Sequence, residues 1–332
     1  SNSSKYVRGK KIGEGLLILA ALTDRAFGVV YEGLCTSDKS VVAIKVIPCN
    51  TNLPFLDEEA KALHSVKSEY VVKYVDVVVE PREVWVGQIS PFHESACYGV
   101  LQQGIGWQLS SQWKEVEGVE IRDIAACSLL GLNDLHKQRI IHRVIHSSHL
   151  SGIDIKPDNL LFSDNGTVKL GDFGLATQLG SSSSHRSTIC GTFCYMAPEV
   201  FDGGTCLKSD VWSLGITLIE LAEGRNPFGA SNVAAVTKSI CLNPPPSLSS
   251  SAYSSDFVDF VKQCLVKEHE QRPSVAELLT VGLSGLSHTQ HPFIVDAVRA
   301  ITQNGVSPVL ANIVGANSTP CLLYTSPSPR DG

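Results

Sequence analysis

Short apolar runs separated by turns fill the first part of the chain, and longer amphipathic stretches fill the second. Residues 5–49 alternate such runs with turns, and residues 70–86 add two more, which is typical of an antiparallel sheet. Residues 120–143, 208–228 and 256–279 repeat apolar positions at helical spacing, and the last two stretches each contain a proline near the end. The pattern predicts an α+β chain with a small antiparallel β lobe followed by a larger α-helical lobe.

The composition is that of an ordinary globular enzyme. The 332 residues are 43% apolar and 18% charged, and the net charge of -6 gives no reason to expect nucleic acid or an anionic membrane as a partner. Ten cysteines show neither CxxC pairing nor metal-ligand spacing, which favours reduced thiols. The apolar run 16–22 is too short to span a bilayer. We therefore expect a cytoplasmic protein.

The stretch from Asp154 to Ala176 carries the most informative pattern. Two apolar runs flank a polar turn, which predicts a β-hairpin whose open end brings together Asp154, Asn159 and Asp172. Carboxylate and amide oxygens are the ligands that Mg²⁺ prefers, together with substrate phosphates. A carboxylate left off the metal could accept a proton from an attacking hydroxyl. The alternative is that these acids are solvated turn residues.

A second pattern lies near the N-terminus. Gly13, Gly15 and Gly28 fall between strand-like runs, where backbone N–H groups can approach phosphates closely because glycine has no Cβ. Lys45 follows within the apolar run VVAIKVI, and Glu59 lies 14 residues further on in a helical segment. Glycines of a tight turn and a solvated lysine are the alternatives.

These motifs resemble those of protein kinases, in which D-x-K-x-x-N and D-F-G supply the catalytic and metal-binding segments. The later stretches, TICGTFCYMAPEV and SLGITLIELAEG among them, resemble the Hippo-type or germinal-centre branch of the sterile-twenty-like serine/threonine kinases. The resemblance implies a bilobal protein-kinase fold over residues 5–300. Residues 5–86 would be the N-lobe, 87–118 an atypical hinge region, 119–300 the C-lobe and 301–332 a tail outside the domain.

The resemblance also implies phosphorylation of serine or threonine on protein substrates, with ATP and Mg²⁺ as cofactors. The residues that would surround ATP come from the glycine loop, the neighbouring strands, a helix and the later hairpin: Ile12, Gly13, Gly15, Gly28, Val30, Ala43, Lys45, Glu59 and Leu161. Among them, Lys45 would contact the α- and β-phosphates and would itself be held by Glu59.

Four residues would carry the phosphoryl transfer. Asp172 and Asn159 would bind Mg²⁺. Asp154 would orient the substrate hydroxyl and take its proton, and Lys156 would neutralise the γ-phosphate. A lysine two residues after the catalytic acid suits serine/threonine rather than tyrosine kinases.

Regulation would fall on the Ser-rich segment between the DFG and APE motifs. Thr188 matches the site of an activating phosphate, which would pair with Arg143. An upstream kinase or trans-autophosphorylation would add this phosphate. Thr192 matches a threonine that contacts the catalytic Asp and Lys. Glu199 and Arg272 match a buried ion pair with a structural role.

Three insertions of ten residues, at 16–25, 144–153 and 281–290, each split a motif and resemble unspliced short introns. Removing the first would give IGEGAFGVVYEG, an ordinary glycine loop. Residues 87–118 read as a frame-shifted hinge or as a divergent loop, and 318–332 resemble translated adaptor sequence. The insertions leave open an alternative function, a catalytically impaired kinase-like scaffold or nucleotide-binding module.

Overall fold

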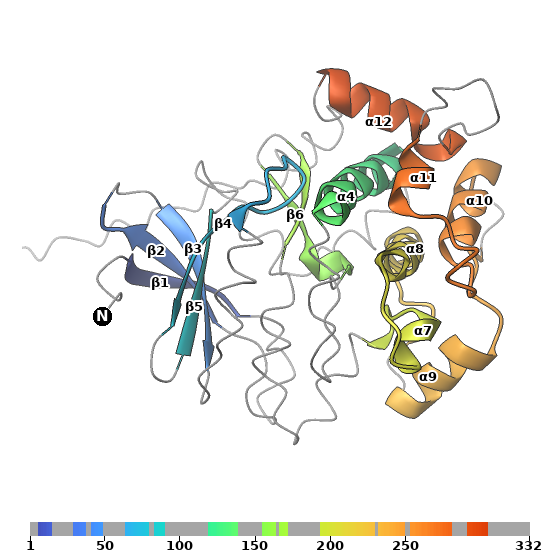
Figure 1. Cartoon of the computed structure of the whole chain (residues 1–332), viewed down its shortest axis with the longest axis horizontal. Coiled ribbons are helices and arrows are strands. Elements are labelled where there is room, and N and C mark those ends of the chain that lie inside the picture. Colours follow the sequence, from blue (N-terminus) through green and yellow to red (C-terminus); the bar gives the residue numbers. More distant parts are fainter. Residues whose placement is uncertain are drawn as a thin grey trace, which may run out of the picture.

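A small sheet and a larger group of helices form the two ends of the molecule in the computed structural model (Figure 1). The structure describes residues 6–14, 29–37, 41–48, 64–79, 83–89, 119–138, 155–163, 166–171, 193–229, 232–249, 253–280 and 291–304.

The strands of the sheet lie on the N-terminal side of the chain. Within the described residues they are β1 (Tyr6–Glu14), β2 (Val29–Cys35), β3 (Val41–Pro48), β4 (Tyr74–Val79) and β5 (Glu83–Ile89). Their order is β1-β2-β3-β5-β4, and every neighbouring pair is antiparallel. The antiparallel sheet predicted from 5–49 and 70–86 is confirmed.

Alternation along β3 explains one face of this sheet. Val42, Ile44 and Val46 are buried, and they pack in a small core with Tyr6 and Val78. Side chains two residues apart share a face of a strand, so the run VVAIKVI places its alternate apolar side chains in this core. Strand β5 continues three residues past Val86, where Ile89 pairs with Val42, so the first residues of the atypical hinge region extend the sheet.

The larger lobe consists of helices and a short hairpin. The described helices are α4 (Val119–Lys137), α7 (Pro198–Phe201), α8 (Leu207–Glu223), α9 (Val233–Leu242), α10 (Ser255–Cys264), α11 (Val275–Leu279) and α12 (Pro292–Asn304). The hairpin is β6 (Leu160–Phe162) with β7 (Val168–Leu170). The predicted helical stretches 120–143 and 208–228 correspond to α4 and α8, whereas 256–279 forms two helices, α10 and α11.

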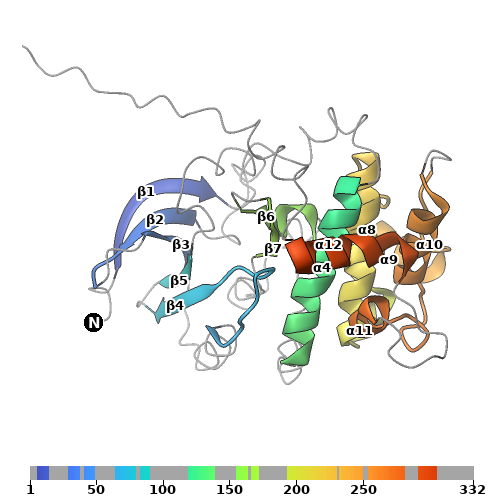
Figure 2. The ribbon, with the colours of Figure 1, turned by 90° about the horizontal axis from the view of Figure 1, so that it is seen from above.

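Helix α8 lies at the centre of this lobe. All its residues from Ser209 to Ile219 are buried, as expected of a helix that is largely apolar on every side. Figure 2 shows it beside α4, with α12 crossing α4. Gly224 ends α8 in the left-handed conformation (φ 68°), which a glycine adopts without strain.

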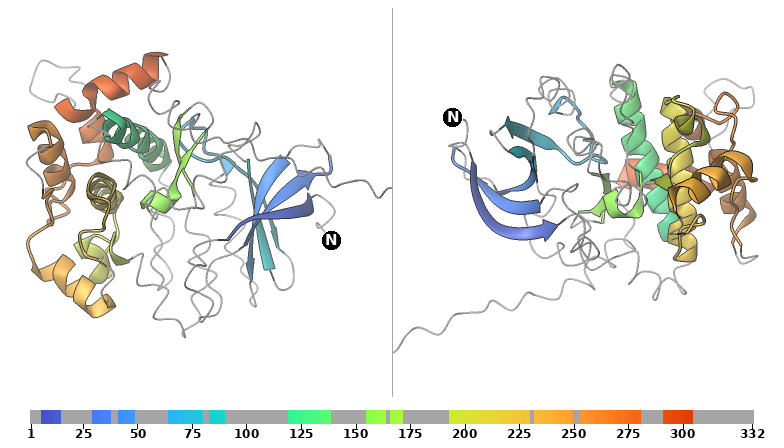
Figure 3. Two further views of the ribbon diagram at one scale, coloured as in Figure 1. Left: turned by 180° about the vertical axis from the view of Figure 1, so that it is seen from behind. Right: turned by 90° about the horizontal axis from the view of Figure 1, so that it is seen from below.

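Residues 64–73, here called the linking segment, join the two lobes. The Val72 amide donates to the Leu170 carbonyl (2.8 Å), and the Leu170 amide donates to the Tyr70 carbonyl (2.9 Å). Val66 and Val71 belong to the core of the larger lobe. The two views of Figure 3 show the hairpin between the sheet and the helices. The linking segment is therefore built into the larger lobe before the chain enters β4.

Three further findings bear on the expected limits of the fold. Helix α12 runs to Asn304, past the predicted domain end at 300, and Ile301 is buried. None of the helices that the structure describes is long and apolar enough to cross a membrane. Six cysteines lie within the described residues, and all six are free thiols.

Candidate active site

The predicted hairpin forms the base of the candidate site. Leu160 pairs with Leu170 and Phe162 pairs with Val168 in antiparallel register. At the open end the Gly171 amide donates to the Asn159 carbonyl at 2.9 Å. The predicted hairpin is confirmed. It brings Gly171, which directly precedes Asp172 in the sequence, into contact with Asn159.

The segment before β6 is a single 3-10 turn, η4 (Pro157–Asn159). Pro157 fixes φ at the first helical position, where its missing N–H costs nothing. The Asn159 amide donates to the Lys156 carbonyl at 3.0 Å, and the Asn159 side chain is buried. Proline and this hydrogen bond therefore set the spacing between Lys156 and Asn159, two of the predicted catalytic residues.

Leu161 and Gly171 approach each other closely beside this turn. A Cβ added to Gly171 would lie 2.8 Å from Leu161 Cδ1, so a larger residue would displace the leucine predicted to contact adenine. Leu160, Val168 and Leu170 are buried in the large core on the other side. The hairpin is consequently held against the main core by these three side chains.

Strand pairing also gathers predicted residues in the sheet. Gly13 of β1 pairs with Val30 of β2, and Val30 in turn pairs with Lys45 of β3. These three residues form one row across three strands. Ile12 precedes Gly13 on β1, and Ala43 lies two residues before Lys45 on β3. The pairing of the strands thus makes neighbours of the glycine motif and the lysine motif, which are far apart in the sequence.

Several predicted site residues lie outside the described part of the chain: Gly15, Gly28, Glu59, Arg143, Asp154, Asp172, Thr188 and Thr192. Two of them adjoin described residues in the sequence, since Asp154 precedes Ile155 and Asp172 follows Gly171. The three insertions, and residues 90–118 of the hinge region, also lie outside it.

The expected ion pair between Glu199 and Arg272 is present. Arg272 Nη1 and Nη2 lie 2.8 and 3.0 Å from the two Glu199 carboxylate oxygens, which is a bidentate contact. The Arg272 side chain is fully buried, and the guanidinium lies over the Trp212 ring, with 5.3 Å to its centroid. Burial alone would raise the pKa of Glu199, but the hydrogen bonds and charge of Arg272 outweigh it and lower that pKa.

The arginine also binds the backbone around it. Its Nε donates to the Val266 carbonyl (2.8 Å), Nη1 to the Lys208 carbonyl (2.9 Å) and Nη2 to the Lys267 carbonyl (3.2 Å). With the two bonds to Glu199, all five guanidinium N–H groups have acceptors. Arg272 therefore joins the first turn of α7, the start of α8 and the loop after α10.

A buried pair that sequence reasoning did not single out links α4 to α8. His136 Nε2 lies 2.7 Å from Asp210 Oδ2, and both side chains are largely buried. Burial raises the pKa of Asp210, and the hydrogen bond and charge of His136 oppose that rise. A lone acid in the otherwise apolar run DVWSLGI was the available signal, because buried acids require partners.

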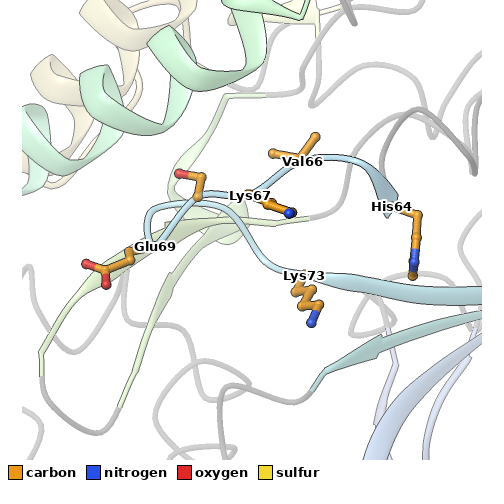
Figure 4. Close-up of a pocket in the computed structure, with 6 residues that line it drawn as sticks. His64, Val66, Lys67, Glu69 and Lys73 are labelled. Carbon is orange, nitrogen blue, oxygen red and sulfur yellow. The ribbon is translucent and has the colours of Figure 1, made fainter.

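The linking segment also lines a surface pocket with a volume of about 580 Å³ (Figure 4). Its walls include the side chains of His64, Lys67 and Lys73 together with the buried Val66. On the neighbouring strand, Lys169 donates to the Glu69 carbonyl at 2.6 Å. None of the pocket's described lining residues is among those predicted to bind ATP.

Comparisons with known proteins agree with this geometry. The family model "Protein kinase domain" matches residues 6–282. Among curated proteins, the serine/threonine-protein kinase hippo of Drosophila melanogaster is 33% identical over 292 residues, covering 84% of this chain. The chain spans 40% of that relative's length. Because the family model extends from the first strand of the sheet through the last described residues of α11, the chain belongs to the protein kinase family.

Proposed function

We propose that this chain transfers the γ-phosphate of ATP to serine or threonine hydroxyls of protein substrates. The observation that carries the proposal is the hairpin register, in which the Asn159 carbonyl accepts from the Gly171 amide. Asp172 of the D-F-G motif follows Gly171 directly in the sequence, and Asp154 of the D-x-K-x-x-N motif lies five residues before Asn159. The serine/threonine preference rests on Lys156 and on the hippo relative.

Each group on the chain has a defined task in this proposal. Asp154 accepts the proton of the substrate hydroxyl, and Lys156 neutralises charge on the transferred phosphoryl group. Lys45 orients the α- and β-phosphates from the sheet side, and this role is supported by its pairing with Val30, which itself pairs with Gly13. Positioning and charge neutralisation supply most of the catalysis in such reactions.

The donor set fits Mg²⁺. Asn159 offers an amide oxygen and Asp172 a carboxylate, which are the hard oxygen ligands that this ion prefers, and substrate phosphates complete its coordination. Asn159 and Asp172 would hold the ion, which would supply positive charge to offset the negative charge of the phosphates. Phosphorylation of Thr188 by an upstream kinase or a second copy of the chain would regulate the site.

The test is a kinase assay on the chain from which the insertions are removed and the hinge frame is restored. Asp154→Asn should lower kcat by at least about two orders of magnitude through loss of the positioned base. An Asp154→Asn protein with full activity would refute the assignment. Thermal stabilisation by Mg·ATP without phosphoryl transfer would favour the nucleotide-binding scaffold instead.

A further inference from the structure

Helix α8 carries three hydroxyl side chains, here called the hydroxyl row, spaced four residues apart: Ser209, Ser213 and Thr217. Residues at this spacing lie on one face of a helix. Ser209 Oγ donates to Glu199 Oε1 (2.8 Å), and Ser213 Oγ donates to the Tyr195 carbonyl (2.7 Å). Successive turns of α8 therefore hold different parts of the segment 193–200.

The last member of the row reaches the candidate active site. Thr217 Oγ1 lies 3.1 Å from the carbonyl oxygen of Ile155, which is 62 residues away in the sequence. The same hydroxyl lies 2.8 Å from the Ser213 carbonyl of its own helix, so one proton is shared between two acceptors. A threonine within a helix commonly bonds only the carbonyl four residues earlier. The second acceptor, on another segment, is the informative contact.

Burial makes this contact consequential. The Thr217 side chain is fully buried, and Ile155 is 1% exposed. A carbonyl group in such a place requires a donor from the protein, because water does not reach it. Thr217 supplies that donor from α8, whose residues from Ser209 to Ile219 are all buried.

The position of Ile155 gives the contact its functional meaning. Ile155 follows Asp154 in the sequence and precedes Lys156, and η4 then leads directly to Asn159. A rotation of the Ile155 peptide group would displace these neighbours together. A displacement of about 1 Å at reacting groups can lower a rate by roughly a hundredfold.

We propose that Thr217 is a positioning residue that fixes the backbone of residues 155–159 relative to α8, and thereby sets where the proposed catalytic groups lie. The inference rests on the proposed function for its effect on rate. Ser213, one turn earlier, fixes Tyr195 to the same helix, so the hydroxyl row holds the catalytic segment and the segment 193–200 in one register.

Four variants of the full chain test this proposal by hydrogen exchange and by steady-state kinetics, the fourth being Ser213→Ala. Thr217→Val keeps the shape of the side chain but removes the hydroxyl, and Thr217→Ser restores it. Thr302→Val is the matched control, because Thr302 Oγ1 donates to the Val298 and Arg299 carbonyls of its own helix. Mass spectrometry follows amide exchange in peptides that cover 155–163 and 193–200.

We expect Thr217→Val to raise exchange within 155–163 at least about threefold and to lower kcat at least about tenfold, with the KM for ATP within twofold of the parent. Thr217→Ser should recover both measures, and Thr302→Val should change neither. Ser213→Ala should raise exchange within 193–200 without the same increase in 155–163, which provides a second reading if Thr217→Val unfolds.

Unchanged amide exchange and unchanged kcat in a folded Thr217→Val protein would overturn the proposal. It would also be overturned if Thr217→Ser raised exchange and lowered kcat as much as Thr217→Val. Equal exchange in both peptides of the Ser213→Ala protein would also overturn it. Exchange that responds as expected in a parent chain that transfers no phosphate would support the positioning role and would favour the nucleotide-binding scaffold over the proposed function.

Discussion

Replacing Arg272 by methionine would remove a charge that the larger lobe encloses completely. The guanidinium gives two hydrogen bonds to Glu199 and three to backbone carbonyls, at 2.8 to 3.2 Å. Methionine has a similar length and no donor. The variant would leave the Glu199 carboxylate without its partner in a place where its side chain is 10% exposed.

The size of the effect follows from this burial. Removing one partner of a buried ion pair costs about 3–5 kcal/mol, because the remaining charge stays desolvated. A change of 1 kcal/mol shifts the melting temperature of a domain of 150–250 residues by about 2–4 °C, so we expect a decrease of about 6–20 °C. The carbonyls of Val266, Lys208 and Lys267 also lose their donor, which adds to this cost.

The assay is thermal unfolding followed by circular dichroism, with Arg299→Met as the matched control. Arg299 lies 3.2 Å from Asp296 in an exposed pair on α12, so its loss should cost under about 1 kcal/mol. A decrease below about 2 °C for Arg272→Met, or an equal decrease for both variants, would refute the argument that the buried pair holds the lobe together.

The same pair predicts a pH dependence of stability. The pKa of Glu199 lies below its ordinary value of 4.5 in the folded chain, so the pair contributes fully above pH 4.5. That contribution is lost as the pH falls from 4.5 through the folded pKa. The free energy of unfolding of Glu199→Gln should therefore depend less on pH below 4.5 than that of the parent. Urea unfolding at several pH values measures this, and the same change of that free energy with pH in both proteins would contradict the prediction.

Three further predictions concern packing, regulation and the insertions. Gly131→Ala should destabilise the chain by about 1–3 kcal/mol in urea unfolding, since its Cβ would lie 2.6 Å from the Tyr70 carbonyl; a stabilised variant would contradict this. Thr188→Ala should abolish activation by phosphorylation, and a variant as active as the phosphorylated parent would refute that role. Removing the three insertions and restoring the hinge frame should raise kcat/KM roughly a hundredfold. Equal kcat/KM would mean that the insertions are tolerated loops.

The hairpin and the sheet were predictable because their signals are local. Two apolar runs around the turn that contains Gly166 (φ 83°) specify the hairpin, and alternation along β3 specifies a buried face. The pairing of Glu199 with Arg272 was predictable only through the family resemblance, since 73 residues separate them. The roles of Asp154 and Asp172 stay predictions.

Other features depend on contacts that local patterns do not encode. The stretch 256–279 keeps an apolar pattern throughout, yet it divides into α10 and α11, and between them the carbonyls of Val266 and Lys267 accept hydrogen bonds from Arg272. Ser274, which caps α11 and follows Pro273 in the sequence, was the local sign of that break. The row from Gly13 through Val30 to Lys45 depends on strand register. Motifs recognised one at a time do not specify which residues pair across the strands.

The attachment of the linking segment has a mechanical consequence. The Val72 amide is hydrogen-bonded to Leu170 of β7 in the larger lobe, and the chain enters the sheet at Tyr74. On this path, Lys73 is therefore the one residue between the larger lobe and the sheet. On this path, a swing of the sheet against the helices would require rotation at Lys73, because bending earlier would break backbone hydrogen bonds. The strand order places β1 farthest from β4, so a small torsion at Lys73 gives the largest sweep to the strand that carries Gly13.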